Sequence, residues 1–300
     1  MKIIRPVTIT NTVLDSSNLA ENDYAAWSGA TTYALGDRVI LTSTHRIYES
    51  AINSNLNNNP ALNDPTKWIN VGATNKWKPF DGVIADQATN TTTITYSLIP
   101  SSLVNAIAFF NLNATTLNVT VDDPTDGIVY DEDFPLVDNG AVENWFSYFF
   151  EPIVRKSELI ALDLPNYASA TIDITITGDT GAEVGVGEIV IGNQKTLGLT
   201  LYNTVVGIQD YSRKDIDEFG NATITKRRFA QTVDYDVKVN TSAVRDTQKT
   251  LAEYRATPLV FTGTDEGTYG DLVYGYYRSF SINIATPSLS DATIEVEGLV

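Results

Sequence analysis

The sequence contains no cysteine, a single histidine, and no apolar run of the ~20 residues that a membrane-spanning helix needs. Without cysteine, disulfides, thiolate metal sites and cysteine nucleophiles are excluded, so stability has to come from packing, from oligomerisation, or from both. Basic side chains are also scarce, because 20 Lys and Arg stand against 37 Asp and Glu, which gives a formal net charge of −17. Phosphate binding needs a positive face, so a nucleic-acid partner is disfavoured.

The scarcity of histidine also narrows the possible chemistry. Any Ser-His-Asp triad or histidine base would have to use His45, and neither G-x-S-x-G nor H-E-x-x-H is present. We therefore expect His45 to be a surface residue. The acidic run from Asp122 to Asp133 lacks the spacing of an EF-hand and is predicted to be a solvated loop. No catalytic residue, metal site or cofactor is predicted, and we do not expect an enzyme.

Short alternating runs rich in Thr, Val and Ile make up most of the chain, separated by Asn, Asp, Gly and Pro. Examples are TTTITYSLI (91–99), TTLNVTV (115–121) and ATIDITIT (170–177). This period-two pattern predicts a mainly β fold class. One amphipathic helix is predicted at about 241–256, where polar capping residues precede it and Pro258 prevents its continuation.

The composition divides the chain into four segments. We expect an N-terminal strand or arm (1–19), a small aromatic-rich β domain (20–76), a β-sandwich of the jelly-roll kind (77–193), and a β-rich assembly domain that contains the helix (194–300). A chain of 300 residues is long enough for each larger segment to bury a core of its own.

The small segment has a recognisable spacing of aromatic and turn residues: Trp27, Ser28, Thr32, Tyr33, Gly36, Asp37, Val39, Tyr48, Pro65, Trp68, Val71 and Gly72. It resembles the small carbohydrate-binding modules of the chitin- and cellulose-binding type. The resemblance implies a saccharide site, whose candidate residues are Trp27, Tyr33, Tyr48, Trp68 and Trp77. A domain of ~50 residues must also build its core from a few large rings, so the same residues have a purely structural interpretation.

A projecting β-hairpin is predicted at DEFGNATITKRRF (217–229), with Gly220 and Asn221 supplying the positive φ of its turn. Its stem concentrates charge, and ribbons of this kind often pair with another chain. The candidate assembly residues are Arg213, Lys214, Lys226, Arg227 and Arg228.

The last third of the chain, with DYSRKDIDEFGNATITKRRFA (210–230), TLAEYRATPLVF (250–261) and the Tyr-rich end (269–299), resembles minor tail proteins of tailed bacteriophages, as does WFSYFFEPI (145–153). The resemblance implies a structural protein of the tail tip or baseplate. Its partners would be copies of itself, other tail proteins and a host-surface glycan, and it would be assembled in the host cytoplasm into the virion. The alternative is an adhesin that binds host polysaccharide.

Overall fold

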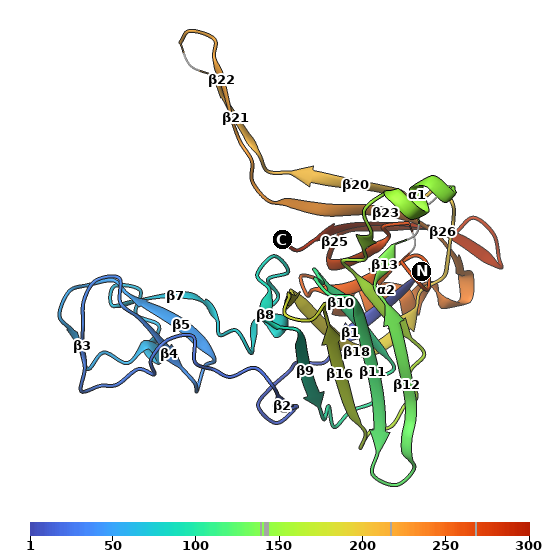
Figure 1. The fold of residues 1–300 in the computed structure, drawn as a ribbon. Coiled ribbons are helices and arrows are strands. Elements are labelled where there is room, and N and C mark those ends of the chain that lie inside the picture. The colour runs from blue at the N-terminus through green and yellow to red at the C-terminus, as the bar shows by residue number, and fades with distance from the viewer. Residues whose placement is uncertain (139, 141–143, 217, 268) are drawn as a thin grey trace.

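The computed structural model describes residues 1–138, 140, 144–216, 218–267 and 269–300. These residues are mainly β, which confirms the predicted fold class. Figure 1 shows a small domain on one side, two larger sheets beside it, and two segments that project from the body. No helix among the described residues is long and apolar enough to cross a membrane.

A five-stranded antiparallel sheet forms one layer of a β-sandwich. Its order is β12-β11-β16-β9-β2, with bounds β2 (Leu14–Ser17), β9 (Thr93–Leu98), β11 (Thr116–Asp123), β12 (Gly127–Pro135) and β16 (Thr171–Thr177). Buried and less buried residues alternate along β9, β11 and β16, because one face packs on the core and the other meets solvent. The predicted alternation therefore corresponds to one buried sheet face.

A ten-stranded antiparallel sheet forms the second, curled layer (Figure 1). Its path is β15-β10-β18-β1-β24-β25-β26-β23-β19, and β20 also pairs with β23. The bounds are β1 (Lys2–Pro6), β10 (Ala106–Phe110), β15 (Leu159–Leu162), β18 (Glu188–Thr196), β19 (Leu199–Thr200), β20 (Val205–Asp210), β23 (Phe229–Asn240), β24 (Leu259–Thr262), β25 (Leu272–Asn283) and β26 (Leu289–Gly298).

The ten-stranded sheet contains strands from three of the four expected segments, namely 1–19, 77–193 and 194–300. β18 contains the expected boundary at 193/194 and pairs with β10 on one side and β1 on the other. Residues 1–19, which were expected to form a strand or arm, contain two strands: β1 lies inside this sheet, and β2 pairs with β9. Ile3 and Ile4 are both fully buried, on opposite faces of β1. Side chains covered on both faces place this strand in a sheet interior, and the chain end is part of the scaffold.

Three apolar clusters hold these layers together. One fills the sandwich between the five-stranded sheet and β10, β15 and β18, with Phe109, Tyr96 and Ile174 at its centre. A second lies on the opposite face of the same part of the curled sheet and includes Phe110 and Tyr274. In β10 all five residues are buried, since both of its faces are covered.

The third cluster lies under the predicted helix, which the structure contains in shorter form. A 3₁₀ turn η3 (Thr241–Ala243) leads into α2 (Val244–Glu253), and Leu251 of α2 is fully buried against β23 and β26. Three further helical segments were not predicted: α1 (Trp145–Phe150) and the 3₁₀ turns η1 (Pro60–Leu62) and η2 (Lys78–Phe80).

The small domain has strands and a core of its own. Its three-stranded sheet is β4 (Arg38–Leu41), β5 (Arg46–Ser50) and β7 (Trp68–Ala73), beside the pair β3 (Thr32–Tyr33) and β6 (Asn55–Leu56). Three short pairs complete the chain: β8 (Ala88–Thr91) with β17 (Glu183–Val186), β13 (Val137–Asp138) with β14 (Val154–Arg155), and β21 (Arg213–Ile216) with β22 (Ala222–Thr225).

Candidate assembly surfaces

The aromatic residues nominated for sugar binding in the small domain form its core instead. Tyr33, Tyr48 and Trp68 are 8%, 3% and 4% exposed, and Trp27 packs against them half-buried. The rings of Tyr33 and Trp68 meet edge to face at 5.2 Å, and Trp68 Nε1 donates to the carbonyl of Asn58 at 2.8 Å. A sugar platform needs an exposed ring face, so the prediction is wrong for these three buried rings.

Trp77 and His45 join the small domain to the sandwich. Trp77 is 8% exposed within the sandwich core, and the His45 ring stacks on it with centroids 4.0 Å apart. His45 Nδ1 lies 2.9 Å from Glu21 Oε1, which also accepts from Thr74 Oγ1 at 2.8 Å. Trp77 therefore offers no exposed ring face to a sugar, and His45, which was expected at the surface, is partly buried, with 19% of its side chain exposed. Both side chains lie at the junction between the small domain and the sandwich.

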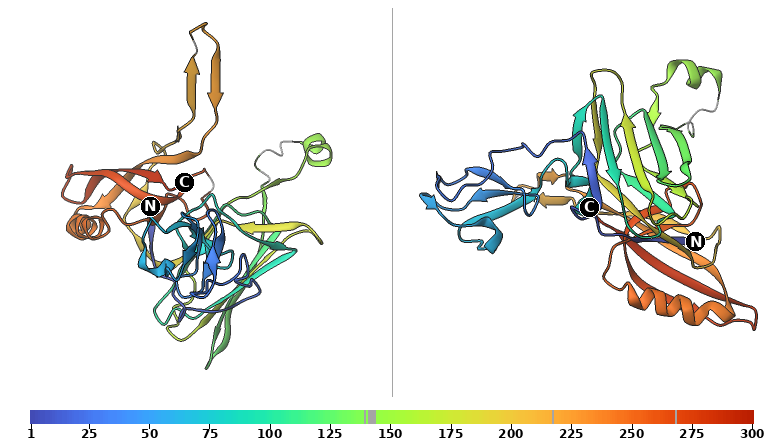
Figure 2. Two further views of the ribbon diagram at one scale, coloured as in Figure 1. Left: turned by 90° about the vertical axis from the view of Figure 1, so that its left-hand side faces the viewer. Right: turned by 90° about the horizontal axis from the view of Figure 1, so that it is seen from below.

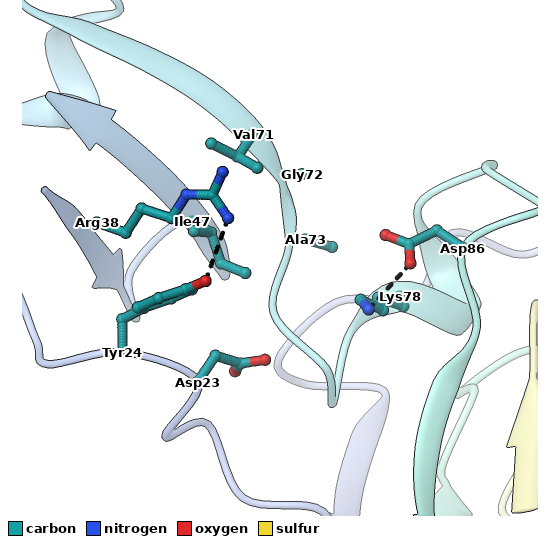
Figure 3. A pocket seen from close by; sticks show the side chains of 9 residues that line it. All are labelled: Asp23, Tyr24, Arg38, Ile47, Val71, Gly72, Ala73, Lys78 and Asp86. Atoms are coloured by element: carbon teal, nitrogen blue, oxygen red, sulfur yellow. Dashed lines mark hydrogen bonds and ion pairs between the residues drawn. The ribbon is translucent and has the colours of Figure 1, made fainter. Parts of the chain in front are cut away.

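A hollow of about 390 Å³ opens beside this junction (Figure 3). Tyr24 and Arg38 line one side of it, and Lys78 and Asp86 line the other. Arg38 forms an ion pair with Glu49 at 2.8 Å and also donates to the Tyr24 hydroxyl at 3.2 Å, and Lys78 lies 3.0 Å from Asp86. No group of three or more His, Asp or Glu in the described ranges could hold a metal ion. Asp23 also lines the hollow; its Oδ1 accepts from the N–H of Asn75 at 3.0 Å, whereas its buried Oδ2 has no hydrogen-bond partner among the described residues.

The acidic run that was predicted to be a solvated loop forms most of the β11–β12 hairpin. Asp123 closes its turn by accepting from the backbone N–H groups of Thr125 and Asp126 and from Ser169 Oγ. The Ser169 hydrogen bond in particular holds the pKa of Asp123 below its ordinary value. The run was misjudged because carboxylates on the solvent face of a strand look the same in sequence as carboxylates of a loop.

The first projecting segment carries a cluster of exposed aromatic rings, which we term the aromatic arm (residues 144–154). Its exposed apolar side chains and exposed fractions are Trp145 78%, Phe146 67%, Tyr148 63%, Phe149 66%, Phe150 74%, Ile153 68% and Val154 51%. Asn144 Oδ1 accepts from the N–H of Phe146 at 2.9 Å, and Pro152 follows the end of α1. These two residues are the local signals by which the sequence could have predicted α1.

The rings of the aromatic arm pack mainly on each other. Trp145 stacks on Phe149 with centroids 6.0 Å apart, and Phe146 lies 5.1 Å from Phe150. Figure 2 shows the segment standing away from the sheets. Soluble proteins rarely leave so many large apolar side chains together in water, and such surfaces mark contact sites.

The second projecting segment contains the predicted hairpin, and we term it the hairpin arm (residues 205–216 and 218–229). β20 and β23 leave the curled sheet as a pair, and β21 and β22 extend them outward (Figures 1 and 2). Asp217, the first residue of the predicted turn, lies outside the described residues. Gly220 takes a φ of 84°, as a tight turn requires, whereas Asn221 does not have a positive φ.

The predicted basic assembly residues lie where β21 and β22 join the strands β20 and β23. Arg213 is paired with Asp215 at 2.7 Å, whereas the remaining four make no ion pair in the part of the chain that is described: Lys214, Lys226, Arg227 and Arg228. Exposed apolar residues accompany them, at Ile208 (64%), Ile216 (64%) and Ile224 (73%). The hairpin arm thus offers unpaired strand edges, positive charge and apolar side chains together.

Comparison with known proteins gives no further guide, because no protein-family model, curated protein or solved structure matches this chain.

Proposed function

We propose that this chain is a structural component of a bacteriophage tail tip or baseplate. In this role it is built into the virion in the host cytoplasm and acts through protein–protein contacts, without catalysing a reaction. The observation that carries the proposal is the pair of arms, each of which exposes large apolar side chains far from the three cores. The resemblance of residues 145–153 and 210–299 to minor tail proteins supports the same function.

The arrangement of the arms suits an assembling subunit. Burial of apolar surface is worth roughly 25 cal/mol per Å², so a partner that covers the aromatic arm gains binding free energy from every ring. Exposed strand edges accept strands from other proteins, and the hairpin arm presents such edges. The hairpin arm extends from β20 and β23 of the curled sheet, and the aromatic arm lies between the paired strands β13 and β14.

The alternative function, an adhesin for host polysaccharide, has less support. Tyr33, Tyr48, Trp68 and Trp77 are buried, and Trp27 packs against the small-domain core. We propose that these rings stabilise the small domain and its junction, and that any contact of this domain with a host glycan uses other residues.

Immunogold electron microscopy of tailed particles from the bacterium that carries the gene tests the proposal. Antibodies against this chain should label the tail end farthest from the capsid. Purified intact particles that lack the chain would overturn the proposal.

A matched pair of variants connects the position in the particle to the aromatic arm. Trp145→Ser with Phe149→Ser should yield particles without complete tail tips, because the exposed rings are lost from the contact. The control is Tyr202→Ser, since Tyr202 is 100% exposed and lies outside both arms. Binding of the purified full chain to chitin or lipopolysaccharide glycans, with normal particles from the arm variant, would instead favour the adhesin.

A further inference from the structure

The outer part of the hairpin arm is a sheet with no second layer. All eight residues of β21 and β22 are exposed, and the two strands pair only with each other among the described strands. Such a two-stranded ribbon is marginally stable in water unless something packs on it. Its structure therefore calls for a partner, and its side chains indicate the chemistry of that partner.

The two faces of the ribbon differ. Lys214 lies opposite Ile224, and Ile216 lies opposite Ala222, so these four side chains share one face. The neighbouring segment adds Lys226, Arg227 and Arg228, none of which has an ion-pair partner in the described chain. The arm also carries Asp210, Asp215 and Glu218, so the unpaired basic side chains are concentrated where β21 and β22 join β20 and β23. The complement of this apolar and basic region is a strand edge with acidic side chains.

The same chain carries an edge of that kind. β12 is the last strand of the five-stranded sheet, and in the described structure it pairs only with β11. Asp131 and Asp133 are exposed on one face of β12, where both accept from Asn118 Nδ2, and Glu132 is exposed on the other face. No Lys or Arg occurs between Thr116 and Pro135. Ile128, 64% exposed, adds an apolar side chain to the edge.

We propose that the hairpin arm of one copy docks against the acidic edge strand β12 of a second copy. This deepens the proposed function and rests on it. Lys214, Lys226, Arg227 and Arg228 meet Asp131, Glu132 and Asp133 across the contact, while the open edges of the two sheets approach each other. The acidic residues of β12 deter uncharged or acidic strands, so the edge selects a basic one.

The contact is head to tail. Figures 1 and 2 show the hairpin arm and β12 extending from different sides of the molecule, so one copy does not cover its own edge. Each subunit then donates a hairpin to one neighbour and receives one from another. Repetition of such a contact closes a ring or extends a filament, and a ring is the geometry expected around a tail axis.

Two charge-reversal variants of the full chain test the contact. The hairpin variant carries Lys226→Glu, Arg227→Glu and Arg228→Glu, and the edge variant carries Asp131→Lys, Glu132→Lys and Asp133→Lys. A control variant reverses three exposed charges on and beside α2: Arg245→Glu, Lys249→Glu and Arg255→Glu. Circular dichroism verifies that each variant is folded, and sedimentation velocity measures association at about 50 mM and about 500 mM salt, where screening differs strongly.

The wild type and the control variant should self-associate, more weakly at high salt. Each test variant alone should associate at least about tenfold more weakly, because like charges then face each other. An equimolar mixture of the two test variants should associate again, since every contact between a hairpin variant and an edge variant pairs opposite charges. Unchanged association of either variant, a mixture that stays monomeric, or a monomeric wild type would overturn the proposal.

This result is separable from the position of the chain in a particle. Particle labelling at the tail tip without rescue in the mixture removes the proposed interface and leaves the proposed function. Rescue in the mixture without labelling of particles leaves the interface and removes the tail assignment.

Discussion

Glu188 gives a quantitative test of how the curled sheet is built. It lies opposite Phe110 in the pairing of β18 with β10 and is 4% exposed. Its side-chain oxygen Oε2 accepts from the N–H of Gly82 at 3.0 Å. Burial raises the pKa of Glu188 to about 9, and the nearby Asp81 adds to the shift. The folded chain therefore holds Glu188 protonated at neutral pH.

The consequence is a stability that falls as pH rises. The unfolded chain loses the Glu188 proton near pH 4.5, whereas the folded chain keeps it until about pH 9. Between these two pH values the folded state binds one proton more than the unfolded state. The contribution of Glu188 to the free energy of unfolding is therefore complete below pH 4.5 and declines by ~1.4 kcal/mol per pH unit as the pH rises toward 9. From about pH 5 to about pH 8 the free energy of unfolding should lose about 4 kcal/mol through this group.

Glu188→Gln keeps the shape and the acceptor oxygen but removes the titration. The difference in unfolding free energy between variant and wild type should grow in favour of the variant by about 4 kcal/mol over that pH range. Urea unfolding followed by far-UV circular dichroism at several pH values measures it. The control is Glu183→Gln, at an exposed position of β17. Parallel pH profiles for wild type and Glu188→Gln would refute the reasoning.

Three further predictions concern packing. Tyr235→Phe removes a fully buried hydroxyl that donates to the carbonyl of Asp271, so urea unfolding should show a loss of about 1–3 kcal/mol. Gly275→Ala would place a Cβ 2.1 Å from the Glu297 carbonyl oxygen and should lower the free energy of unfolding by about 1–3 kcal/mol or more. In the control Gly207→Ala, the Cβ meets only Thr232 Oγ1, at 3.2 Å, so the loss of stability should be smaller. His45→Ala removes the stack on Trp77 and the contact with Glu21, so trypsin should cleave faster at Lys76; an unchanged cleavage rate would contradict a locking role for His45.

Local pattern was sufficient for the strands whose two faces differ. In β11 the alternation of Leu117, Val119 and Val121 with polar residues is the same in sequence and in burial. The α2 helix was predictable for a related reason. Val244, Leu251 and Tyr254 lie on one face of the helix, and Pro258 prevents its continuation. α1 was missed because its aromatic residues have no polar face, so they show no period.

The candidate site residues were harder to interpret, because a ring in a core and a ring on a platform are the same residue. Tyr48 of β5 and Trp68 of β7 are core residues because the pairing of β4, β5 and β7 places both rings in one buried cluster. His45 contacts Glu21 and Trp77 because of the position of the small domain beside the sandwich, and no spacing in the sequence predicts that position.

The sequence by itself determined the mainly β fold, the projecting hairpin and the absence of cysteine chemistry, since each depends on residue type or on neighbours along the chain. The tertiary structure decided that β18 and β1 join two segments in one sheet and that the rings of the aromatic arm are exposed among the described residues. It also decided that β12 is an open, acidic edge. Pairing partners and exposure are properties of residues far apart in the chain, and local pattern carries no information about which strand ends a sheet.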